Sequence, residues 1–259
     1  MPDAVRYAVA KRVAHIVLDR PPVNALSLDM IRAVIAALRR AAADDEARAV
    51  VLSSAVVLSS AVARHFCAGL DLAMLLGKSR EEVREFVHAL YVELYECQCD
   101  LGKPSIAAVR GSARGGGMTM AISCDVILAG LHATFGYPEI RIGVLPAIHF
   151  VHLPRIAGRH RAFELLFSGR TFAAQEAYEL GLVSKVVPDA ELDAAADALA
   201  ADFAAKSPRV MRAARLAFMR QNDDRRRIAD AVEDFCDVAT TDAAQEGIRA
   251  FLEKRAPRW

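Results

Sequence analysis

The order of apolar and polar positions at the start of the chain predicts a strand pair followed by a helix. Residues 5–9 and 13–18 are rich in β-formers and are separated by two basic residues, which is typical of a hairpin. After a loop at 19–26, Ser27 can cap a helix, and we expect the next strand to begin near Ala49. Apolar residues fall at helical spacing after this cap, namely Leu28, Ile31, Val34, Ile35 and Leu38.

The next segment contains a tandem repeat. Residues 50–55 and 56–61 both have the sequence VVLSSA. Both copies are strand-like, yet together they exceed the usual strand length of ~5 to 6 residues. We therefore predict that one copy occupies the sheet and that the other extends the loop or the strand end before Arg64.

Strand and helix patterns continue to alternate in the middle of the chain. Ser79 and Glu82 form a capping box ahead of apolar positions at helical spacing, which predicts a long helix to about Cys97. Residues 106–109 are a short apolar run, typical of a strand covered on both faces, and the glycine-rich segment after them opens another helix. The sequence DVILA at 125–129 predicts a further buried strand.

From Arg159 onward the apolar spacing is mostly helical, with a last strand at 183–187. We expect helices at 162–167, 173–180, 190–206, 208–220, 225–240 and 242–254. Because alternating strands and helices are followed by helices alone, the predicted fold class is α/β with a C-terminal helical subdomain. We place the core at residues 1–190 and the helical subdomain at 191–259.

Composition indicates a globular protein with a balanced net charge. The 259 residues are 54% hydrophobic, and 33 basic residues nearly cancel 32 acidic ones, so there is no overall electrostatic footprint for nucleic acid or an anionic membrane. The N-terminus lacks an apolar signal region, and no apolar run reaches ~18 residues. We therefore expect a cytoplasmic protein with neither a nucleic-acid nor a membrane partner.

Cysteine usage favours reduced thiols. The chain has an odd, scattered set, namely Cys67, Cys97, Cys99, Cys124 and Cys236. The pair at 97 and 99 has no second pair that would complete a tetrahedral zinc site. We therefore predict no metal.

Familiar nucleotide and nucleophile motifs are absent. There is no G-x-x-x-x-G-K-[ST], and the glycines at 115–117 do not complete G-x-G-x-x-G because of Met120. Ser112 comes directly after a glycine rather than two residues on, so there is no G-x-S-x-G. His149 and His152 have apolar neighbours, which favours pocket or packing histidines over metal ligands, and we retain them as candidate substrate contacts.

Two glycine turns and one carboxylate remain. The helix that opens at 115–117 presents unpaired N–H groups and its positive dipole end, and HFCAGLDL at 65–72 supplies a second turn. We predict that the N–H groups of Leu70 and Gly116 converge on one oxygen as an oxyanion hole. Glu139 is a candidate base or acid beside it, if burial moves its pKa towards neutrality. The alternatives are a merely connecting turn and a structural glutamate.

Five segments in this order resemble the enoyl-CoA hydratase/isomerase (crotonase) superfamily. They are LDRPPVNALS at 18–27, HFCAGLDL at 65–72, AAVRGSARGGGMTMAISCDVILA at 107–129, FGYPEIRIGVLP at 135–146 and the final AFLEKRAPRW. The resemblance covers essentially the whole chain. It implies a spiral of repeated ββα units, a C-terminal helical region that helps to form trimers, often paired into hexamers, and a substrate bound as its coenzyme A thioester with no separate cofactor.

The resemblance also assigns site residues. It carries the family's oxyanion hole over to the N–H groups of Leu70 and Gly116, which would hold the thioester carbonyl as it becomes an enolate. The segments 24–26 and 68–72 correspond to those that line the coenzyme A path. The binding residues that we select from them are Ala25, Leu26, Ala68 and Asp71.

The sequence departs from the family pattern in two places. Hydratases of the family usually carry two glutamates, of which the first falls on Thr119 and the second is retained as Glu139. A threonine hydroxyl near neutral pH is a poor general base, although its spacing from Gly116 would let one helix bring both to the pocket. Residues 146–150, PAIHF, replace a glycine-rich segment, and their bulk should reshape the acyl pocket.

These departures favour one reaction of the family. A single acid/base residue, Glu139, is enough to move a proton between carbons through an enolate, whereas adding water is commonly a two-carboxylate task. We therefore expect an enzyme of the enoyl-CoA hydratase/isomerase type in which isomerisation is favoured over efficient hydration. The alternatives are thioester hydrolysis, decarboxylation or dehalogenation in the same oxyanion hole, and a non-catalytic acyl-CoA-binding relative.

Overall fold

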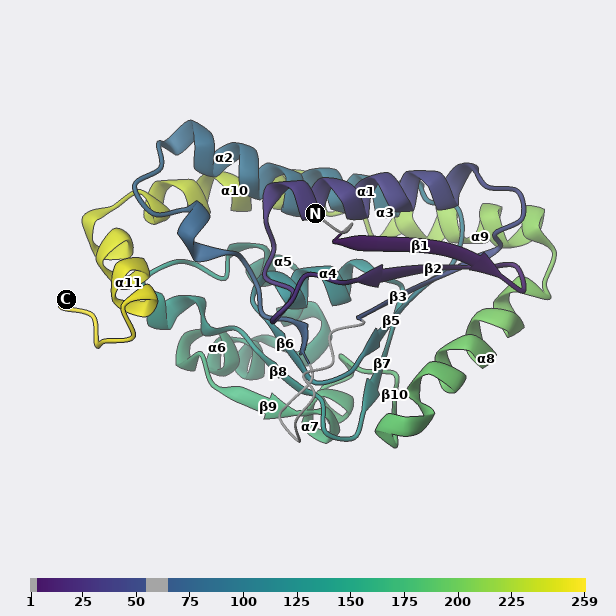
Figure 1. Cartoon of the computed structure of the whole chain (residues 1–259). Helices are drawn as coiled ribbons and strands as arrows, with labels where there is room; N and C mark the ends of the chain where they lie inside the picture. Colours follow the sequence, from purple (N-terminus) through teal and green to yellow (C-terminus); the bar gives the residue numbers. More distant parts are fainter. Residues whose placement is uncertain (1–3, 55–64) are drawn as a thin grey trace.

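A computed structural model describes residues 4–54 and 65–259, and a six-stranded sheet runs through its centre (Figure 1). Its strands, in spatial order, are β1 (Val5–Ala10), β2 (Val13–Leu18), β3 (Ala49–Ser54), β5 (Ser105–Val109), β7 (Val126–Gly130) and β10 (Lys185–Val187). β1 and β2 form the predicted antiparallel hairpin, and all the other pairs are parallel. The strands expected near residues 49, 106 and 125 are confirmed.

The chain also forms a second, smaller sheet of four strands. Its strands are β4 (His65–Cys67), β6 (Ser112–Arg114), β8 (Thr134–Gly136) and β9 (Thr171–Ala173). β4, β6 and β8 each come next in the chain after β3, β5 and β7, so the chain passes through both sheets before each helical segment. These strands have three residues each, which is too short for a periodic signal, and the apolar pattern does not predict them.

The helices mostly begin and end within a few residues of their expected positions. They are α1 (Leu28–Ala43), α2 (Arg80–His88), α3 (Leu94–Asp100), α4 (Gly116–Ser123), α5 (Ala147–Ala157), α6 (Arg159–Ser168), α7 (Ala174–Glu179), α8 (Leu192–Ala204), α9 (Pro208–Gln221), α10 (Arg225–Ala239) and α11 (Asp242–Leu252). Short helical turns are η1 (Leu72–Met74), η3 (Pro138–Ile142) and η4 (Asp189–Glu191). The pattern does not predict α5, because this helix is apolar on most sides and contains Pro154.

A π-helical turn interrupts the long second helix. The predicted capping box is present: Ser79 Oγ accepts from the Glu82 N–H at 3.2 Å, and Glu82 Oε2 accepts from the Ser79 N–H at 2.9 Å. The helix continues past the expected end at Cys97, through the π turn η2 (Ala89–Glu93) and α3 to Asp100. Such π turns are frequent at functional sites.

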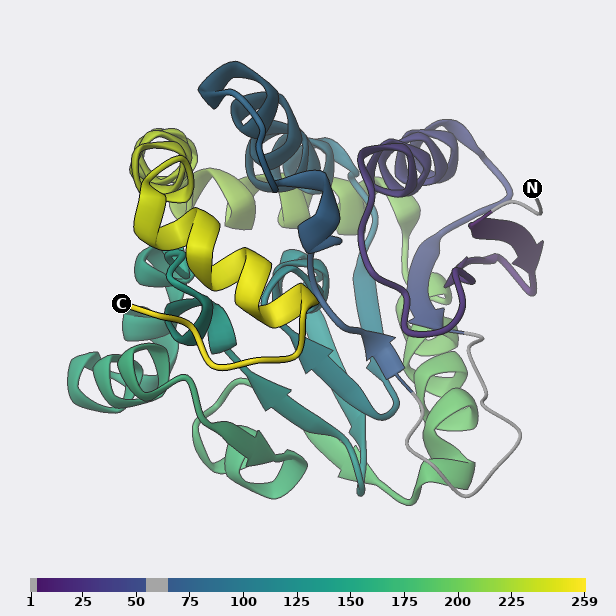
Figure 2. The ribbon, with the colours of Figure 1, turned by 60° about the vertical axis from the view of Figure 1, so that its left-hand side comes forward.

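Helices cover both faces of the central sheet. Val51 and Ile106 contact α8 on one face, whereas Leu52 and Ala107 lie in the larger core under α1, α3 and α4. Figure 2 shows α8 along the sheet and α11 across the opposite end of the molecule, where α11 contacts η1 and η3. Because α8 lies directly against the sheet, the division between residues 190 and 191 stays a prediction.

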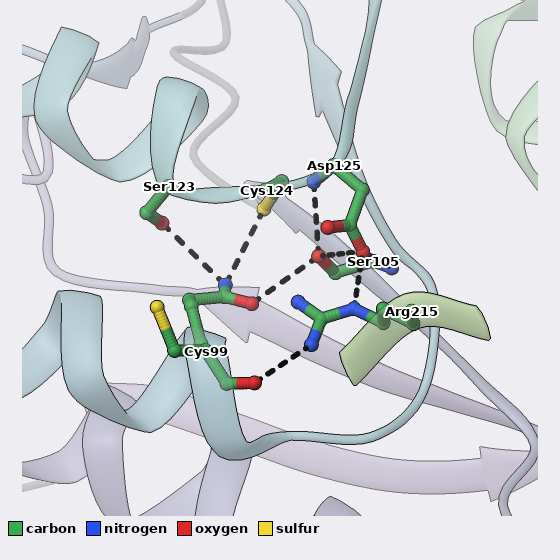
Figure 3. Close-up of polar contacts among 7 residues, drawn as sticks. Cys99, Ser105, Ser123, Cys124, Asp125 and Arg215 are labelled. Carbon is green, nitrogen blue, oxygen red and sulfur yellow. Dashed lines mark hydrogen bonds and ion pairs between the residues drawn. The ribbon is translucent and has the colours of Figure 1, made fainter. Parts of the chain in front are cut away.

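A buried polar cluster attaches α9 to the core. Arg215 is the one buried residue of this helix. Its Nε donates to Asp125 Oδ2 at 2.8 Å, and its Nη1 donates to the carbonyl oxygen of Cys99 at 3.3 Å (Figure 3). Ser105 donates its N–H and its hydroxyl to the same carboxylate oxygen, at 2.8 Å and 3.0 Å. One ion pair therefore joins α9 to the start of β5 and β7.

The remaining expectations have mixed outcomes. Residues 50–54 of the first VVLSSA copy lie in β3, while 56–61, the second copy, fall outside the described residues. All five cysteines are free thiols. Across the described part of the chain, every helix is too short or too polar to traverse a bilayer.

Candidate active site

A pocket of about 250 Å³ opens between the two glycine turns, η3 and the last two helices. The eight residues predicted for catalysis and binding gather around it. Six of them line its wall, namely Ala25, Ala68, Leu70, Asp71, Gly116 and Glu139. The predicted residues belong to segments that are far apart in the chain and that meet at this pocket.

The first glycine turn leaves one N–H group free to face the pocket. Leu26 forms a parallel bridge with Leu70, but its hydrogen bonds go to the neighbours: its N–H donates to the carbonyl of Gly69 at 2.8 Å, and its carbonyl accepts from Asp71 at 2.9 Å. In this pattern the N–H of Leu70 points away from Leu26. Within residues 4–54 and 65–259, that N–H has no hydrogen-bond acceptor.

The second glycine turn opens α4 against the first. Gly115 has φ +49°, which favours glycine, and its carbonyl accepts from Met118 at 2.8 Å and Thr119 at 3.1 Å. The N–H of Gly116, at the first position of the helix, has no acceptor among the described residues. A Cβ on Gly69 would lie 3.5 Å from this nitrogen, so the two turns are in contact.

Glu139 presents its carboxyl group to the same region. It lies in η3 and is 9% exposed, and a Cβ on Gly115 would lie 3.0 Å from its Oε1. Burial raises the pKa of Glu139 to about 8. Its Oε2 is buried and has no hydrogen-bond partner in the described part of the chain. A carboxyl group with this proton affinity can exchange a proton near neutral pH.

Thr119 and Leu26 do not line the pocket. Thr119 is 3% exposed, and its Oγ1 lies 3.5 Å from Nε2 of His149. Of the two residues that α4 was expected to bring to the pocket, Gly116 lines it, whereas the side chain of Thr119 faces α5. Leu26 is fully buried beneath the turn, where its Cδ1 would contact a Cβ placed on Gly116 at 3.0 Å.

The two histidines lie behind the pocket wall rather than in it. His149 is fully buried, and its Nδ1 lies 3.1 Å from Nε2 of His152. Neither side chain is among the residues that line the pocket, so their role as substrate contacts stays a prediction. Burial lowers the pKa of His149 well below its ordinary value and that of His152 to about 3, which keeps both rings neutral.

Comparisons with known proteins show the family of this chain. The profile of the family described as enoyl-CoA hydratase/isomerase matches residues 9–259. The chain belongs to the enoyl-CoA hydratase/isomerase family. It is 32% identical to a probable enoyl-CoA hydratase of Bacillus subtilis over 99% of this chain and 98% of that protein. It is 35% identical to the 2,3-dehydroadipyl-CoA hydratase of Escherichia coli, over 95% and 94% of the two chains.

Solved structures of enoyl-CoA hydratases share the fold. An enoyl-CoA hydratase from Mycobacterium avium superposes with a TM-score of 0.85 at 31% identity, and the match covers 100% of both chains. An enoyl-CoA hydratase from Bacillus anthracis gives a TM-score of 0.77 at 32% identity, over 99% of this chain and 98% of that one. The predicted crotonase-type α/β fold of this family member is therefore confirmed.

The pocket of this enoyl-CoA hydratase/isomerase family member also has walls that the sequence reasoning missed. Tyr91 reaches it from η2, Phe235 from α10, and Phe251 and Leu252 from α11. Their segments carry ordinary amphipathic patterns, so no local signal marks them. Only the tertiary contact of the C-terminal helices with η1, η2 and η3 brings these side chains to the site.

The acidic residue of the first turn is held by a salt bridge. Asp71 Oδ2 accepts from Arg20 Nη2 at 2.9 Å, which ties the loop before α1 to the turn before η1. The N–H of Ala68 donates to the carbonyl of Val23 at 3.0 Å in the same pair of segments. These contacts fix the rim of the pocket and leave Glu139 as its one lining carboxyl group without a salt bridge to Arg or Lys among the described residues.

Proposed function

We propose that this family member moves the double bond of an enoyl-CoA thioester through an enolate, with Glu139 as the acid/base. The observation that carries the proposal is the carboxyl group of Glu139, which among the described residues has no Arg or Lys partner. It lies buried beside two backbone N–H groups that have no acceptor in the same part of the chain. A group that takes a proton from one carbon can return it to another two bonds away. No second acid/base is needed for that reaction.

The N–H groups of Leu70 and Gly116 would bind the thioester carbonyl oxygen. Both are backbone donors fixed before the substrate arrives, and Gly116 adds the positive end of α4. Negative charge grows on the carbonyl oxygen as the enolate forms, so these donors stabilise the transition state more than the substrate. This lowers the cost of removing a proton next to the carbonyl.

Glu139 would then carry the proton. The carboxylate form removes a proton from the substrate carbon, and the resulting carboxylic acid returns it to the far end of the enolate. Since burial raises the pKa of Glu139 to about 8, kcat/KM for isomerisation should rise with pH through that region.

Efficient hydration has less support. Addition of water to an enoyl thioester calls for a group that activates water as well as one that protonates carbon. Thr119 is turned away from the pocket, and Asp71 is occupied by Arg20. We therefore favour isomerase over lyase activity for this chain.

The coenzyme A part of the substrate would lie along the first turn, against Ala25, Leu26, Ala68 and Asp71, largely through backbone contacts. We also propose a cytoplasmic assembly, a homotrimer or a hexamer of two trimers, with α9 in the subunit interface. Support for this interface comes from α9 itself, where Val210 and Phe218 are 66% and 64% exposed.

The test is a panel of 2-enoyl-CoA and 3-enoyl-CoA thioesters analysed by mass spectrometry. The proposal predicts interconversion of the two positional isomers at constant mass. A product heavier by one water would select hydration instead, and free coenzyme A detected by a thiol reagent would select hydrolysis. Thioester binding without any turnover would select a non-catalytic relative.

A further inference from the structure

The histidine pair of α5, the fully buried His149 and the half-buried His152, has no role in the proposed reaction so far. Four polar groups surround the imidazole of His149. Its Nε2 lies 3.3 Å from the carbonyl oxygen of Gly115, 3.5 Å from Oγ1 of Thr119 and 3.8 Å from Oε1 of Glu139, and its Nδ1 lies 3.1 Å from Nε2 of His152. The side chain of His149 therefore contacts the Gly115–Gly116 peptide, which carries the Gly116 N–H. It also approaches Glu139, the proposed acid/base.

The partners of His149 determine where its proton lies. A carbonyl oxygen only accepts, so the contact with Gly115 requires a proton on Nε2. Because the ring is neutral, Nδ1 then carries none and accepts, and His152 donates from its own Nε2. The pair therefore has one proton arrangement, with the Nε2–H dipole directed at the carbonyl of Gly115 and with Oε1 of Glu139 at 3.8 Å from the same nitrogen.

The Nε2–H dipole of His149 acts on two parts of the site from outside the pocket wall. The carbonyl of Gly115 also accepts from the N–H groups of Met118 and Thr119. Because this carbonyl and the N–H of Gly116 belong to one planar trans peptide, the additional donor from His149 helps to hold the N–H towards the pocket. Oε1 of Glu139 faces the same donor at 3.8 Å, while Oε2 has no partner among the described residues. This leaves Oε2 free for the substrate.

We propose that His149 is a positioning residue that, as a neutral donor supported by His152, orients the Gly115–Gly116 peptide and the carboxyl group of Glu139 together. The inference rests on the proposed function and deepens it. It also accounts for Thr119, because a longer acidic side chain at that position would need the space of the imidazole, which already lies 3.5 Å from the hydroxyl.

Among residues 4–54 and 65–259, few titratable groups face Glu139 and His149. The titratable side chains that face Glu139 are His149 from α5, Tyr137 from the residue before η3 and Tyr91 from η2, and burial raises the pKa of both tyrosines. His149 in turn faces His152 on its own helix and the Tyr137 ring, whose centroid is 4.5 Å away. No Lys or Arg of the described residues forms an ion pair with Glu139.

The experiment compares two replacements of His149 in the full-length protein. H149L fills the space but has no donor, whereas H149Q keeps an amide nitrogen as many bonds from Cα as the imidazole Nε2. H160Q is the matched control, since His160 is an exposed residue of α6. Steady-state kinetics of 3-enoyl-CoA isomerisation are measured from pH 6 to 10, and circular dichroism checks that each variant is folded.

H149L should lower kcat by at least ~10-fold with KM nearly unchanged, because the reacting groups lose their orientation. It should also move the rise of kcat/KM to higher pH, since the ionised form of Glu139 loses a donor. H149Q and H160Q should stay within ~3-fold of wild type on the same basis. A folded H149L with wild-type kinetics would overturn the inference, as would an H149Q that falls as far as H149L.

Nuclear magnetic resonance of the ¹⁵N-histidine-labelled wild type keeps the inference testable if H149L does not fold. We expect His149 to show the neutral tautomer with the proton on Nε2 and no titration between pH 5.5 and 8.5. A proton on Nδ1, or titration in this range, would contradict the arrangement. If the wild type isomerises no thioester, the proposed function fails, and this spectrum still tests the histidine pair separately.

Discussion

In the proposed function, Glu139 is the residue at which fold stability and catalysis require opposite protonation states. Its pKa is about 8 in the folded protein against an ordinary value of 4.5, so the folded state holds the proton more tightly than the unfolded state does. The sign follows: the contribution of this group to stability is fully present below pH 4.5 and is lost as the pH rises to about 8. Ionising this carboxyl group, as the proposed reaction requires, therefore destabilises the fold.

Replacement of Glu139 by Gln should remove this penalty. Since glutamine does not ionise, we expect E139Q to raise the Tm at pH 9 by at least ~3 °C and to change it little at pH 4.5. Thermal unfolding followed by circular dichroism at the two pH values measures the difference. E96Q is the control, because Glu96 is exposed on α3 and should show no such pH-dependent gain. An equal change of Tm at both pH values would contradict the buried ionisation.

Some site residues can be predicted from the local sequence, whereas others depend on contacts with distant segments. Leu70 and Gly116 follow from glycine turns, which are visible in the sequence because few other residues permit such backbone turns and close approaches. Glu139 was found by type and position, but its burial was not, since its depth depends on contacts made by distant segments. The same holds for His149, whose apolar neighbours indicated burial without indicating what the ring would face.

At the scale of elements, spacing predicted the long helices and the central strands, while the short elements escaped. Three-residue strands such as β4 and β9 contain less than two periods of alternation, so only their pairing in the second sheet defines them. The π turn η2 has no composition of its own. Its position brings Tyr91 to the pocket and Leu90 near Gly116, where a Cβ would lie 3.3 Å from Cδ2 of Leu90.

The attachment of α9 depends on one buried ion pair, and this gives a prediction for the element. R215M should lower the free energy of unfolding by about 2–4 kcal/mol, because Asp125 loses its cation while it stays partly buried. Urea denaturation measures this value. R220M, an exposed change on the same helix, should stay within ~0.5 kcal/mol of wild type. Equal stabilities of the two variants would show that Arg215 is not the anchor.

At the scale of the whole molecule, α9 carries large apolar side chains that are mostly exposed. Val210 and Phe218 are 66% and 64% exposed, although the rest of the chain buries a large core. Large apolar side chains left open on one helix are typical of a subunit interface. The trimer implied by the family resemblance would cover them.

Sedimentation equilibrium tests this assembly. The wild type should have three or six times the chain mass of 28.1 kDa, and the double variant V210D/F218D should shift towards the monomer while keeping its far-ultraviolet circular dichroism. V9D is the control, since Val9 is an exposed apolar residue of β1 and its replacement should not change the mass of the assembly. A monomeric wild type, or an assembly that the double variant leaves intact, would exclude α9 as the interface.

The central claim is that one carboxyl group beside two backbone donors performs the whole proton transfer. Its most direct test is the conversion of a 3-enoyl-CoA and of crotonyl-CoA by wild type and E139Q, followed by mass spectrometry. We predict that the wild type isomerises the first and hydrates the second poorly, and that E139Q lowers isomerisation by ~10²- to 10⁴-fold while still binding the thioester. Brisk hydration of crotonyl-CoA that E139Q leaves undiminished would contradict both the reaction and the residue.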